Sequence, residues 1–503
     1  MIRLILRPDF GMNQLHMMKH FSGYAVATLF SLGLFAQQGS QPSPDGHKIE
    51  FAIKPYQNQW IYLAYYYGGI KALADSAYLD GNSRGVITGK EKLAEGIYIV
   101  ASPAKSILFE MLVSDDQQFS VSMDTLNPDA TLQFSGSDEN QRFTDYTRFV
   151  NSQATAIEKA RKEMEAAQTA DQKNKLQKQI DDQTRLINDY RIDVIQKHPE
   201  SLLAMLFKSM QETPLPPELQ KPKTRADSLV QYRFAKDHYW DNIDFMDGRL
   251  VRTPIFESKL KNYLNNWVVP DPDSLIYEQN WMMALGRNDP EMSRYLISYF
   301  IDNYMYPKIM GHDKVFLHTY ERYVANNNPA TSWLNEKQRK TITERAYMVM
   351  ANQLGSPAYD IALVDTAGKV KKLYDVKSDF VVVAFWDPHC GKCREELPKM
   401  DSLYNTWWKK SNIQVYSVMV NEEAAKDWKT FIQQTGKGWV HVHQTKEMRA
   451  EEEKAQLPNF RQLYDMRSTP TLFLLDKEKR IMAKNIGLDD LENVLKQKIN
   501  PKG

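Results

Sequence analysis

The sequence is poor in cysteine and has no excess of charge of either sign. Only two of its 503 residues are cysteines, Cys390 and Cys393. Lysine and arginine together number 64, against 63 aspartates and glutamates, and neither sign is gathered into a block. Proteins that bind nucleic acid need a basic patch or stripe to meet the phosphate backbone. The charge balance therefore predicts no nucleic-acid partner.

The sequence also lacks a hydrophobic run of the roughly 20 residues that a transmembrane helix needs. Its candidate segment, residues 24–36, is short, follows the basic flank Met18-Lys19-His20 and ends in a small residue. This is the anatomy of a secretory signal peptide. We predict that residues 1–36 are such a peptide, with a true start at Met17 or Met18, and that the protein is exported rather than integral to a membrane. Retention of the segment as an anchor stays open.

The length of the chain predicts about three domains. Residues 37–46 are polar and contain two prolines, which is typical of a linker. Short runs with a period of two and turn signals over residues 47–137 predict an antiparallel, β-sandwich-like domain. Over residues 138–354, apolar side chains recur three, four or seven apart on charged segments, which predicts an all-α domain. Residues 355–503 alternate strands and helices and predict an α/β domain.

The two cysteines stand where a buried strand gives way to a helix. Residues 381–385 are continuously apolar and β-branched, as in a strand buried on both faces. The following helix should begin at Cys390, where unpaired N–H groups and the helix dipole favour a thiolate. A drop of two pKa units from about 8.5 would raise the thiolate fraction at pH 7 from about 3% to roughly 75%. His389 and Lys392 could add positive charge beside the thiol.

The spacing of the cysteines favours redox chemistry over a structural role. Only two residues, Gly391 and Lys392, separate Cys390 from Cys393. A structural disulfide normally closes a longer loop, because its entropic stabilisation grows with loop length. A pair this close is suited to repeated opening and closing of a disulfide.

Further motifs around the pair resemble the TlpA/ResA-type thioredoxin-like proteins of the bacterial envelope. Trp386 stands four residues before the first cysteine, as in the tryptophan-containing active-site segment of that family, and Pro398, five after the second, is similar to the proline that kinks its active-site helix. Ser468-Thr469-Pro470-Thr471, just before a strand, resembles the cis-proline loop that faces the dithiol and receives the substrate peptide. The resemblance implies a thioredoxin-like fold for residues 355–503 and a periplasmic or cell-envelope location.

The sequence departs from the family pattern at two places. The strand at residues 381–385 has no buried acid, so Glu396, three residues after Cys393, becomes the candidate for proton handling. Lys392 replaces the proline common between the cysteines, which leaves the redox potential open. The activity that the resemblance implies is thiol-disulfide exchange without a cofactor. The expected partners are protein disulfide substrates and a membrane-bound electron donor that keeps the enzyme a reductase.

Other readings of the same residues are weaker. His441 and His443 are candidate zinc ligands, but their distance from Cys393 fits no common zinc spacing. Covalent haem attachment needs a histidine directly after the second cysteine, where Arg394 stands. A thiol peroxidase would carry a threonine three residues before Cys390, where Asp387 stands. A peroxidase and an envelope scaffold protein with an accessory redox domain stay open as alternatives.

Overall fold

The computed structural model describes residues 46–499. The predicted signal peptide and nearly all of the predicted linker lie outside this part of the chain. The described residues form two compact units, one running to Val268 together with Leu285–Ser293, the other comprising Val269–Ala284 and the chain from Arg294. Among the helices of residues 46–499, none has the length and apolar character required to cross a bilayer.

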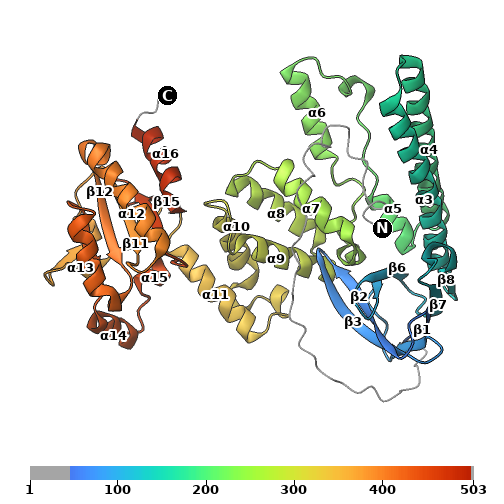
Figure 1. Ribbon diagram of the computed structural model, residues 1–503, viewed down its shortest axis with the longest axis horizontal. Helices are drawn as coiled ribbons and strands as arrows, with labels where there is room; N and C mark the ends of the chain where they lie inside the picture. Colours follow the sequence, from blue (N-terminus) through green and yellow to red (C-terminus); the bar gives the residue numbers. More distant parts are fainter. Residues whose placement is uncertain (1–45, 500–503) are drawn as a thin grey trace. The chain divides into compact units, whose positions relative to one another are not determined.

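The N-terminal strands form two four-stranded sheets (Figure 1). One has the order β4-β1-β7-β8 and the other β3-β2-β5-β6. The strands are β1 (His47–Lys54), β2 (Gln59–Tyr67), β3 (Ile70–Leu79), β4 (Arg84–Gly89), β5 (Gly96–Ala101), β6 (Ile107–Val113), β7 (Gln118–Asp124) and β8 (Gln133–Ser135). Alternate side chains of both sheets enter one buried core, so the sheets pack face to face.

One pairing in these sheets differs from the antiparallel arrangement that the sequence predicts. β1 pairs with β7 in parallel, Lys48 opposite Gln118 through Lys54 opposite Asp124, whereas β1 and β4 are antiparallel. An alternating pattern identifies the strands and the buried face, but it does not encode the direction in which two distant strands meet. The prediction of a wholly antiparallel domain is therefore wrong in this detail.

Helices occupy the middle of the chain, as predicted. They are α2 (Pro128–Thr131), α3 (Asp138–Ala166), α4 (Ala170–Lys197), α5 (Leu202–Ser209), α6 (Arg225–Asp237), α7 (Pro254–Asn266), α8 (Pro272–Gly286), α9 (Pro290–Tyr304), α10 (Asp313–Thr319) and α11 (Glu336–Met350). Ser137 caps α3, and Thr169 forms a capping box at the start of α4. The apolar stripes of α3, α4 and α5 cover the outer face of the second sheet, where Ile97, Ile99 and Leu112 are buried.

The C-terminal residues build a seven-stranded sheet of order β10-β9-β13-β12-β11-β14-β15. Its strands are β9 (Ala362–Val364), β10 (Val370–Lys372), β11 (Phe380–Trp386), β12 (Ile413–Met419), β13 (Val440–His443), β14 (Thr471–Leu475) and β15 (Ile481–Ile486). Its helices are α12 (Gly391–Leu403), α13 (Ala425–Gln434), α14 (Lys446–Lys454), α15 (Phe460–Leu463) and α16 (Leu488–Ile499). The predicted terminal hairpin, β14 and β15, and the predicted thioredoxin-like α/β fold are confirmed.

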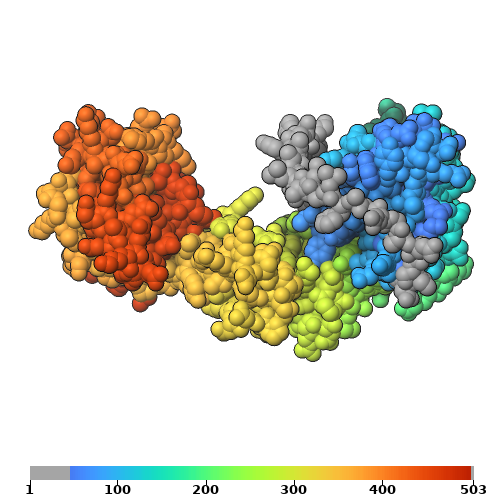
Figure 2. Space-filling view, turned by 90° about the horizontal axis from the view of Figure 1, so that it is seen from below, coloured from blue at the N-terminus to red at the C-terminus, as the bar shows by residue number. Residues whose placement is uncertain are grey.

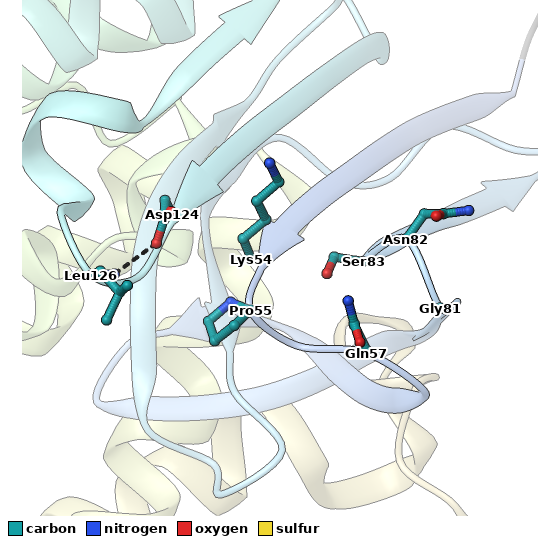
Figure 3. A pocket seen from close by; sticks show the side chains of 8 residues that line it. All are labelled: Lys54, Pro55, Gln57, Gly81, Asn82, Ser83, Asp124 and Leu126. Atoms are coloured by element: carbon teal, nitrogen blue, oxygen red, sulfur yellow. Dashed lines mark hydrogen bonds between the residues drawn. The ribbon is translucent and has the colours of Figure 1, made fainter.

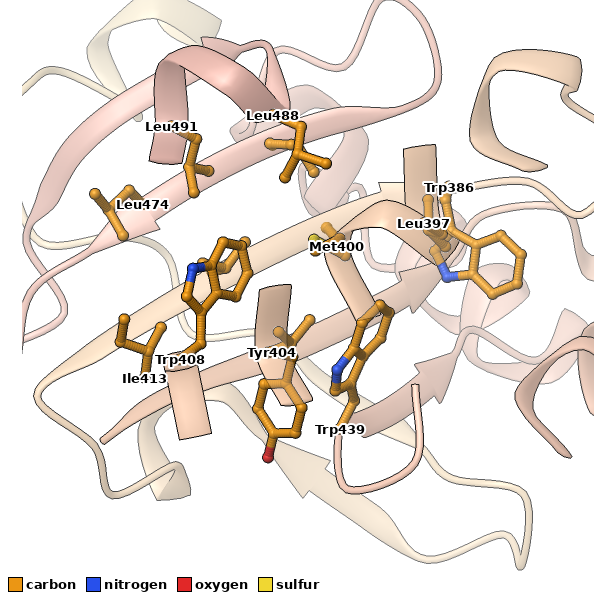
Figure 4. Close-up of a cluster of buried hydrophobic side chains, with 14 of the residues drawn as sticks. Trp386, Leu397, Met400, Tyr404, Trp408, Ile413, Trp439, Leu474, Leu488 and Leu491 are labelled. Atoms are coloured by element: carbon orange, nitrogen blue, oxygen red, sulfur yellow. The ribbon is translucent and has the colours of Figure 1, made fainter. Parts of the chain in front are cut away.

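Strand β11 is buried on both faces, as its apolar run predicts. Val382, Ala384 and Trp386 face a core that includes α12 and α16, while Val381 and Phe385 face a second core on the other side of the sheet. Figure 4 shows the first core, in which Trp386 lies beside the side chains of α12. In the space-filling view, the residues from β11 onward, orange to red, pack as one continuous body (Figure 2). The start of α12 is thereby fixed at one end of a rigid sheet.

Buried polar contacts join the thioredoxin-like residues to the preceding helices within the second unit. Lys484, on β15, is 4% exposed, and its ammonium group bonds to the carboxylate of Asp313 and, at 2.8 Å, to the amide oxygen of Asn352. Arg345, on α11, pairs with the carboxylate of Asp465. Each of these charges has its partner on the other side of the contact, so the two parts depend on each other for stability.

Candidate functional site

The β-domain carries a hollow of about 380 Å³ but no reactive constellation. The hollow is lined by Lys54, Pro55, Gln57, Gly81, Asn82, Ser83, Asp124 and Leu126 (Figure 3). The carboxylate of Asp124 already accepts the backbone N–H of Leu126 at 2.9 Å. The chemistry of the described residues is therefore to be sought at the cysteines.

Cys390 is the N-cap of α12, at the end of the loop that follows β11. Its φ and ψ are −75° and 119°, and its sulfur accepts the backbone N–H of Cys393 at 3.3 Å. An N-cap side chain normally satisfies one of the unpaired N–H groups of the first turn, and here a thiol sulfur takes that place. The helix terminus thus points amide hydrogens at the sulfur, which stabilises its negative charge.

The two thiols differ in exposure. Cys390 is partly exposed, whereas Cys393 is 0% exposed and belongs to the hydrophobic core beside Trp386 and Leu397. Neither is joined in a disulfide. A bulky disulfide from another protein can therefore reach the first sulfur but not the second.

The two thiols also differ in acidity. Partial burial works against ionisation of Cys390, but hydrogen bonds from the Cys393 thiol, from the side chain of Thr469 and from the N–H groups of the first helical turn outweigh it and hold the pKa below its usual value. Burial, with the nearby Cys390 sulfur adding to it, raises the pKa of Cys393 to about 12. At neutral pH, Cys390 is thus the more readily ionised thiol of the pair, and Cys393 holds its proton.

The loop before β14 faces the dithiol. The peptide bond between Thr469 and Pro470 is cis, and the Cys390 thiol lies 3.3 Å from the carbonyl oxygen of Thr469, to which it donates. β14 pairs antiparallel with β11, with Thr471 opposite Phe385, so the sheet itself brings the loop beside the cysteines. The structure therefore brings Cys390 and Cys393 together with Thr469 and Pro470. Cys390 and Thr469 are 79 residues apart in the sequence.

Trp386 is a buried core residue at the end of β11, four residues before Cys390. Its indole is fully buried, donates a hydrogen bond from Nε1 to the hydroxyl of Ser417 at 2.8 Å, and packs on Phe431 with ring centroids 4.6 Å apart. Pro398 lies inside α12, where it removes one backbone donor. The tryptophan therefore fixes the end of β11 from which the active-site loop departs.

The charged residues predicted for the site, Glu396, Lys392 and His389, form ion pairs with other charged side chains. The carboxylate of Glu396 is 3.5 Å from the ammonium of Lys392, one helical turn away on α12. The imidazole of His389 bonds to the carboxylate of Asp427, on α13, at 2.7 Å. The side chains of His389, Asp427 and Lys392 are exposed, so both ion pairs contribute little to the free energy of unfolding.

Two residues that the sequence did not single out for the site shape the active-site loop. The carboxylate of Asp387 accepts the N–H of His389 at 2.8 Å and the side-chain amide of Asn421 at 3.1 Å. The backbone oxygen of Asp387 accepts the N–H of Cys390 at 3.1 Å. An aspartate that bonds the N–H two residues later is a common turn former, and this is the signal that could have identified Asp387.

The two histidines of strand β13 have separate structural partners. The ring of His441 bonds to the backbone oxygen of Gly436 at 2.9 Å, and His443 packs edge-on against Trp428. Within residues 46–499, no group of three or more His, Cys, Asp and Glu side chains is arranged to hold a metal ion.

Comparison with known proteins agrees with this architecture. Residues 354–484 match the AhpC/TSA family, and residues 161–352 match a domain of unknown function (DUF5106). The chain is 28% identical over 152 residues to thiol-disulfide oxidoreductase ResA of Bacillus cereus, which covers 30% of this chain and 80% of that protein. ResA of Geobacillus kaustophilus is 29% identical over 145 residues, covering 28% and 76% of the two chains.

A solved thioredoxin-like protein from Bacteroides caccae is also similar. It is 22% identical with a TM-score of 0.43, and the match covers 57% of this chain and 97% of that one. Through residues 354–484, the chain carries a thioredoxin-like domain of the AhpC/TSA family and is a relative of the ResA thiol-disulfide oxidoreductases.

Proposed function

We propose that the protein is an exported thiol-disulfide reductase of envelope proteins, with Cys390 as the attacking thiol and Cys393 as the resolving thiol. One observation carries the proposal. A partly exposed thiol with a lowered pKa lies beside a buried thiol with a raised pKa, and both lie next to the Thr469-Pro470 loop. This asymmetry suits a reaction in which one sulfur meets the substrate and the other releases it.

The reaction proceeds in two exchanges. The Cys390 thiolate attacks one sulfur of the substrate disulfide, whose S–S bond breaks, and the departing sulfur takes a proton from solvent. The product is a mixed disulfide between Cys390 and the substrate. Cys393 then loses its proton and attacks the Cys390 sulfur, which forms the Cys390–Cys393 disulfide and releases the second substrate thiol. Two electrons and two protons pass to the substrate in total.

The second exchange needs a base, because the pKa of Cys393 is about 12. In our proposal this base is Glu396, three residues along α12 and therefore on the same side of the helix. The carboxylate of Glu396 leaves its ion pair with the exposed Lys392 and accepts the proton of Cys393. Glu396→Gln should slow the release of substrate from the mixed disulfide and leave its formation unchanged, as measured by acid-quenched time courses in which mass spectrometry follows the mixed disulfide.

Glu395→Gln is the matched control for this step. Glu395 is the exposed neighbour of Glu396 on the same helix and carries the same charge. Equal slowing by both variants would mean that general charge, and not a proton acceptor at position 396, sets the rate.

The remaining parts of the proposal concern partners. A membrane-bound dithiol donor returns two electrons to the Cys390–Cys393 disulfide, and the N-terminal domains select the substrate. Removal of residues 47–350, the simplest test of that selection, also removes Asp313 and Arg345, the partners of buried Lys484 and Asp465. The full chain is therefore the form to use, because the truncated one would lose both ion pairs and the packing around them.

The proposal is tested by trapping the mixed disulfide. Cys393→Ser should accumulate a covalent adduct with a disulfide-containing test protein, whereas Cys390→Ser should form none. Non-reducing electrophoresis and mass spectrometry report the adduct and the cysteine that forms it. Absence of an adduct from both variants, with no reduction by the unaltered chain, would favour the scaffold alternative.

A further inference from the structure

A pocket of about 240 Å³ lies where α11, α15 and the approach to the Thr469-Pro470 loop meet. Three arginines line it, Arg345, Arg461 and Arg467, together with the ring of Tyr306 and one acid, Asp465. All of these residues belong to the second compact unit. The proposed redox reaction uses none of them, and the buried pair of Arg345 and Asp465 does not account for the partly exposed Arg467.

The pocket has more positive than negative charge. Asp465 is buried and pairs with buried Arg345, while the guanidinium of Arg467 lies 3.5 Å from the same carboxylate with its side chain 44% exposed. One carboxylate neutralises one guanidinium, so the charge of the more exposed Arg467 is only partly compensated.

Arg461, which also lines the pocket, has an acid of its own, because its guanidinium lies 3.4 Å from the carboxylate of Glu422. Arg449 lies 3.5 Å from the same carboxylate but pairs more closely with Glu453, at 3.0 Å. Glu422 and Glu453 balance these two arginines, so the positive excess that favours an anion comes from Arg467.

Aromatic stacking holds two of the guanidinium groups in place. The central carbons of Arg345 and Arg467 lie 4.7 and 5.1 Å from the ring centroid of Tyr306. Such contacts orient a guanidinium before a ligand arrives, and its planar donors match the two oxygens of a carboxylate. The oriented guanidinium of Arg467 is therefore suited to bind both oxygens of a carboxylate.

Arg467 and Arg461, both of which line the pocket, are connected to the dithiol through short chains of contacts. The Cα atoms of Arg467 and Thr469 are at most about 7.6 Å apart, since each step along the chain spans 3.8 Å, and the Thr469 carbonyl touches Cys390. Arg461 donates to the backbone oxygen of Val420 at 2.7 Å, and the N–H of Val420 donates to the backbone oxygen of Trp386 at 3.0 Å. Trp386 stands four residues before Cys390. A peptide held at Cys390 would thus pass within a few residues of the pocket.

We infer that the pocket binds an acidic side chain of the substrate protein, located a few residues from the disulfide that Cys390 attacks. The inference rests on the proposed function and names the class of substrate it selects. A small disulfide that carries its own carboxylates, such as oxidised glutathione, offers the same chemistry, and the experiment separates the two sources.

The experiment uses the full chain and pairs of disulfide-bonded peptides that differ only by Glu or Gln at positions on either side of the reactive cysteine. The unaltered chain should reduce the better Glu peptide about fivefold faster than its Gln partner at low salt, as a partly exposed ion pair allows, and high salt should remove the preference. Arg467→Gln should bring the ratio of the two rates to about one, whereas Arg467→Lys should keep part of it. Because both rates are measured on the same variant, a general loss of activity cancels in the ratio.

Lys446→Gln, which removes one exposed charge from the start of α14, is the control and should keep the full preference. The inference is overturned if Arg467→Gln keeps the ratio of the unaltered chain, or if the unaltered chain has no preference among the peptides. A preference for oxidised glutathione over neutral hydroxyethyl disulfide, with none among the peptides, would overturn it in favour of a small anion. Failure to reduce hydroxyethyl disulfide at all would instead contradict the proposed function.

Discussion

The opposite acidities of Cys390 and Cys393 predict that alkylation of the reduced protein at pH 7 is confined to Cys390. With a pKa of about 12, Cys393 is a thiolate in only about one molecule in 100,000 at this pH. A thiol with the reference pKa of 9.0, from which the pKa of Cys390 is lowered, is ionised to about 1% at pH 7. The thiolate populations therefore differ at least about 1,000-fold.

The intrinsic reactivity of the two thiolates reduces this difference but does not remove it. A thiolate gains nucleophilicity as its pKa rises, with a coefficient of 0.4–0.5, so a gap of about 3 units favours Cys393 by about 20-fold. The net rate at pH 7 should still favour Cys390 by about 50-fold, before the complete burial of Cys393 slows it further.

The assay is a time course of iodoacetamide modification of the reduced full chain, followed by peptide mass spectrometry. The Cys390→Ser variant reports Cys393 alone. The rate at Cys390 should rise with pH and reach its plateau at a lower pH than that of a free cysteine, because its pKa is lowered. Modification of both cysteines at similar rates, or of Cys393 first, would refute the reasoning.

Three further predictions concern stability. Asp465→Ala leaves Arg345, 3% exposed, without its carboxylate and should lower the free energy of unfolding by about 3–5 kcal/mol in urea; a loss below about 1 kcal/mol would contradict the buried pair. Trp386→Phe leaves the buried Ser417 hydroxyl without its indole donor and should cost about 1–3 kcal/mol, part of which Ser417→Ala should restore. Burial lowers the pKa of His441, so the folded state binds fewer protons than the unfolded one and stability should fall as pH drops below about 6.5; the fall should be as steep in His441→Gln only if this reasoning is wrong.

The parts of the fold that the sequence predicted are those with strong local patterns. The run from Val381 to Phe385 and the segment Leu472 to Leu475 of β14 are continuously apolar, and β15 follows β14 across a short polar turn, so the positions of these strands could be predicted. The hairpin of β9 and β10 escaped prediction because each strand has only three residues, too few for a period to stand out.

The site was predicted in part. The order of Trp386, the two cysteines and Pro470 sufficed to place the dithiol opposite the loop, but the cis peptide bond before Pro470 had to come from the structure, since most X-Pro bonds are trans. The pocket around Arg467 was invisible in the sequence, because α11 and α15 supply its residues from segments more than a hundred positions apart. Neither segment carries a motif.

The central claim is that Cys390 and Cys393 form one reversible two-electron couple. The direct measurement is to equilibrate the full chain in glutathione and dithiothreitol buffers of known potential, trap free thiols, and count them by mass. We predict that both thiols appear and disappear together, at a potential near that of a reducing thioredoxin, about −270 mV. A chain in which no reversible disulfide forms at any potential would contradict the claim.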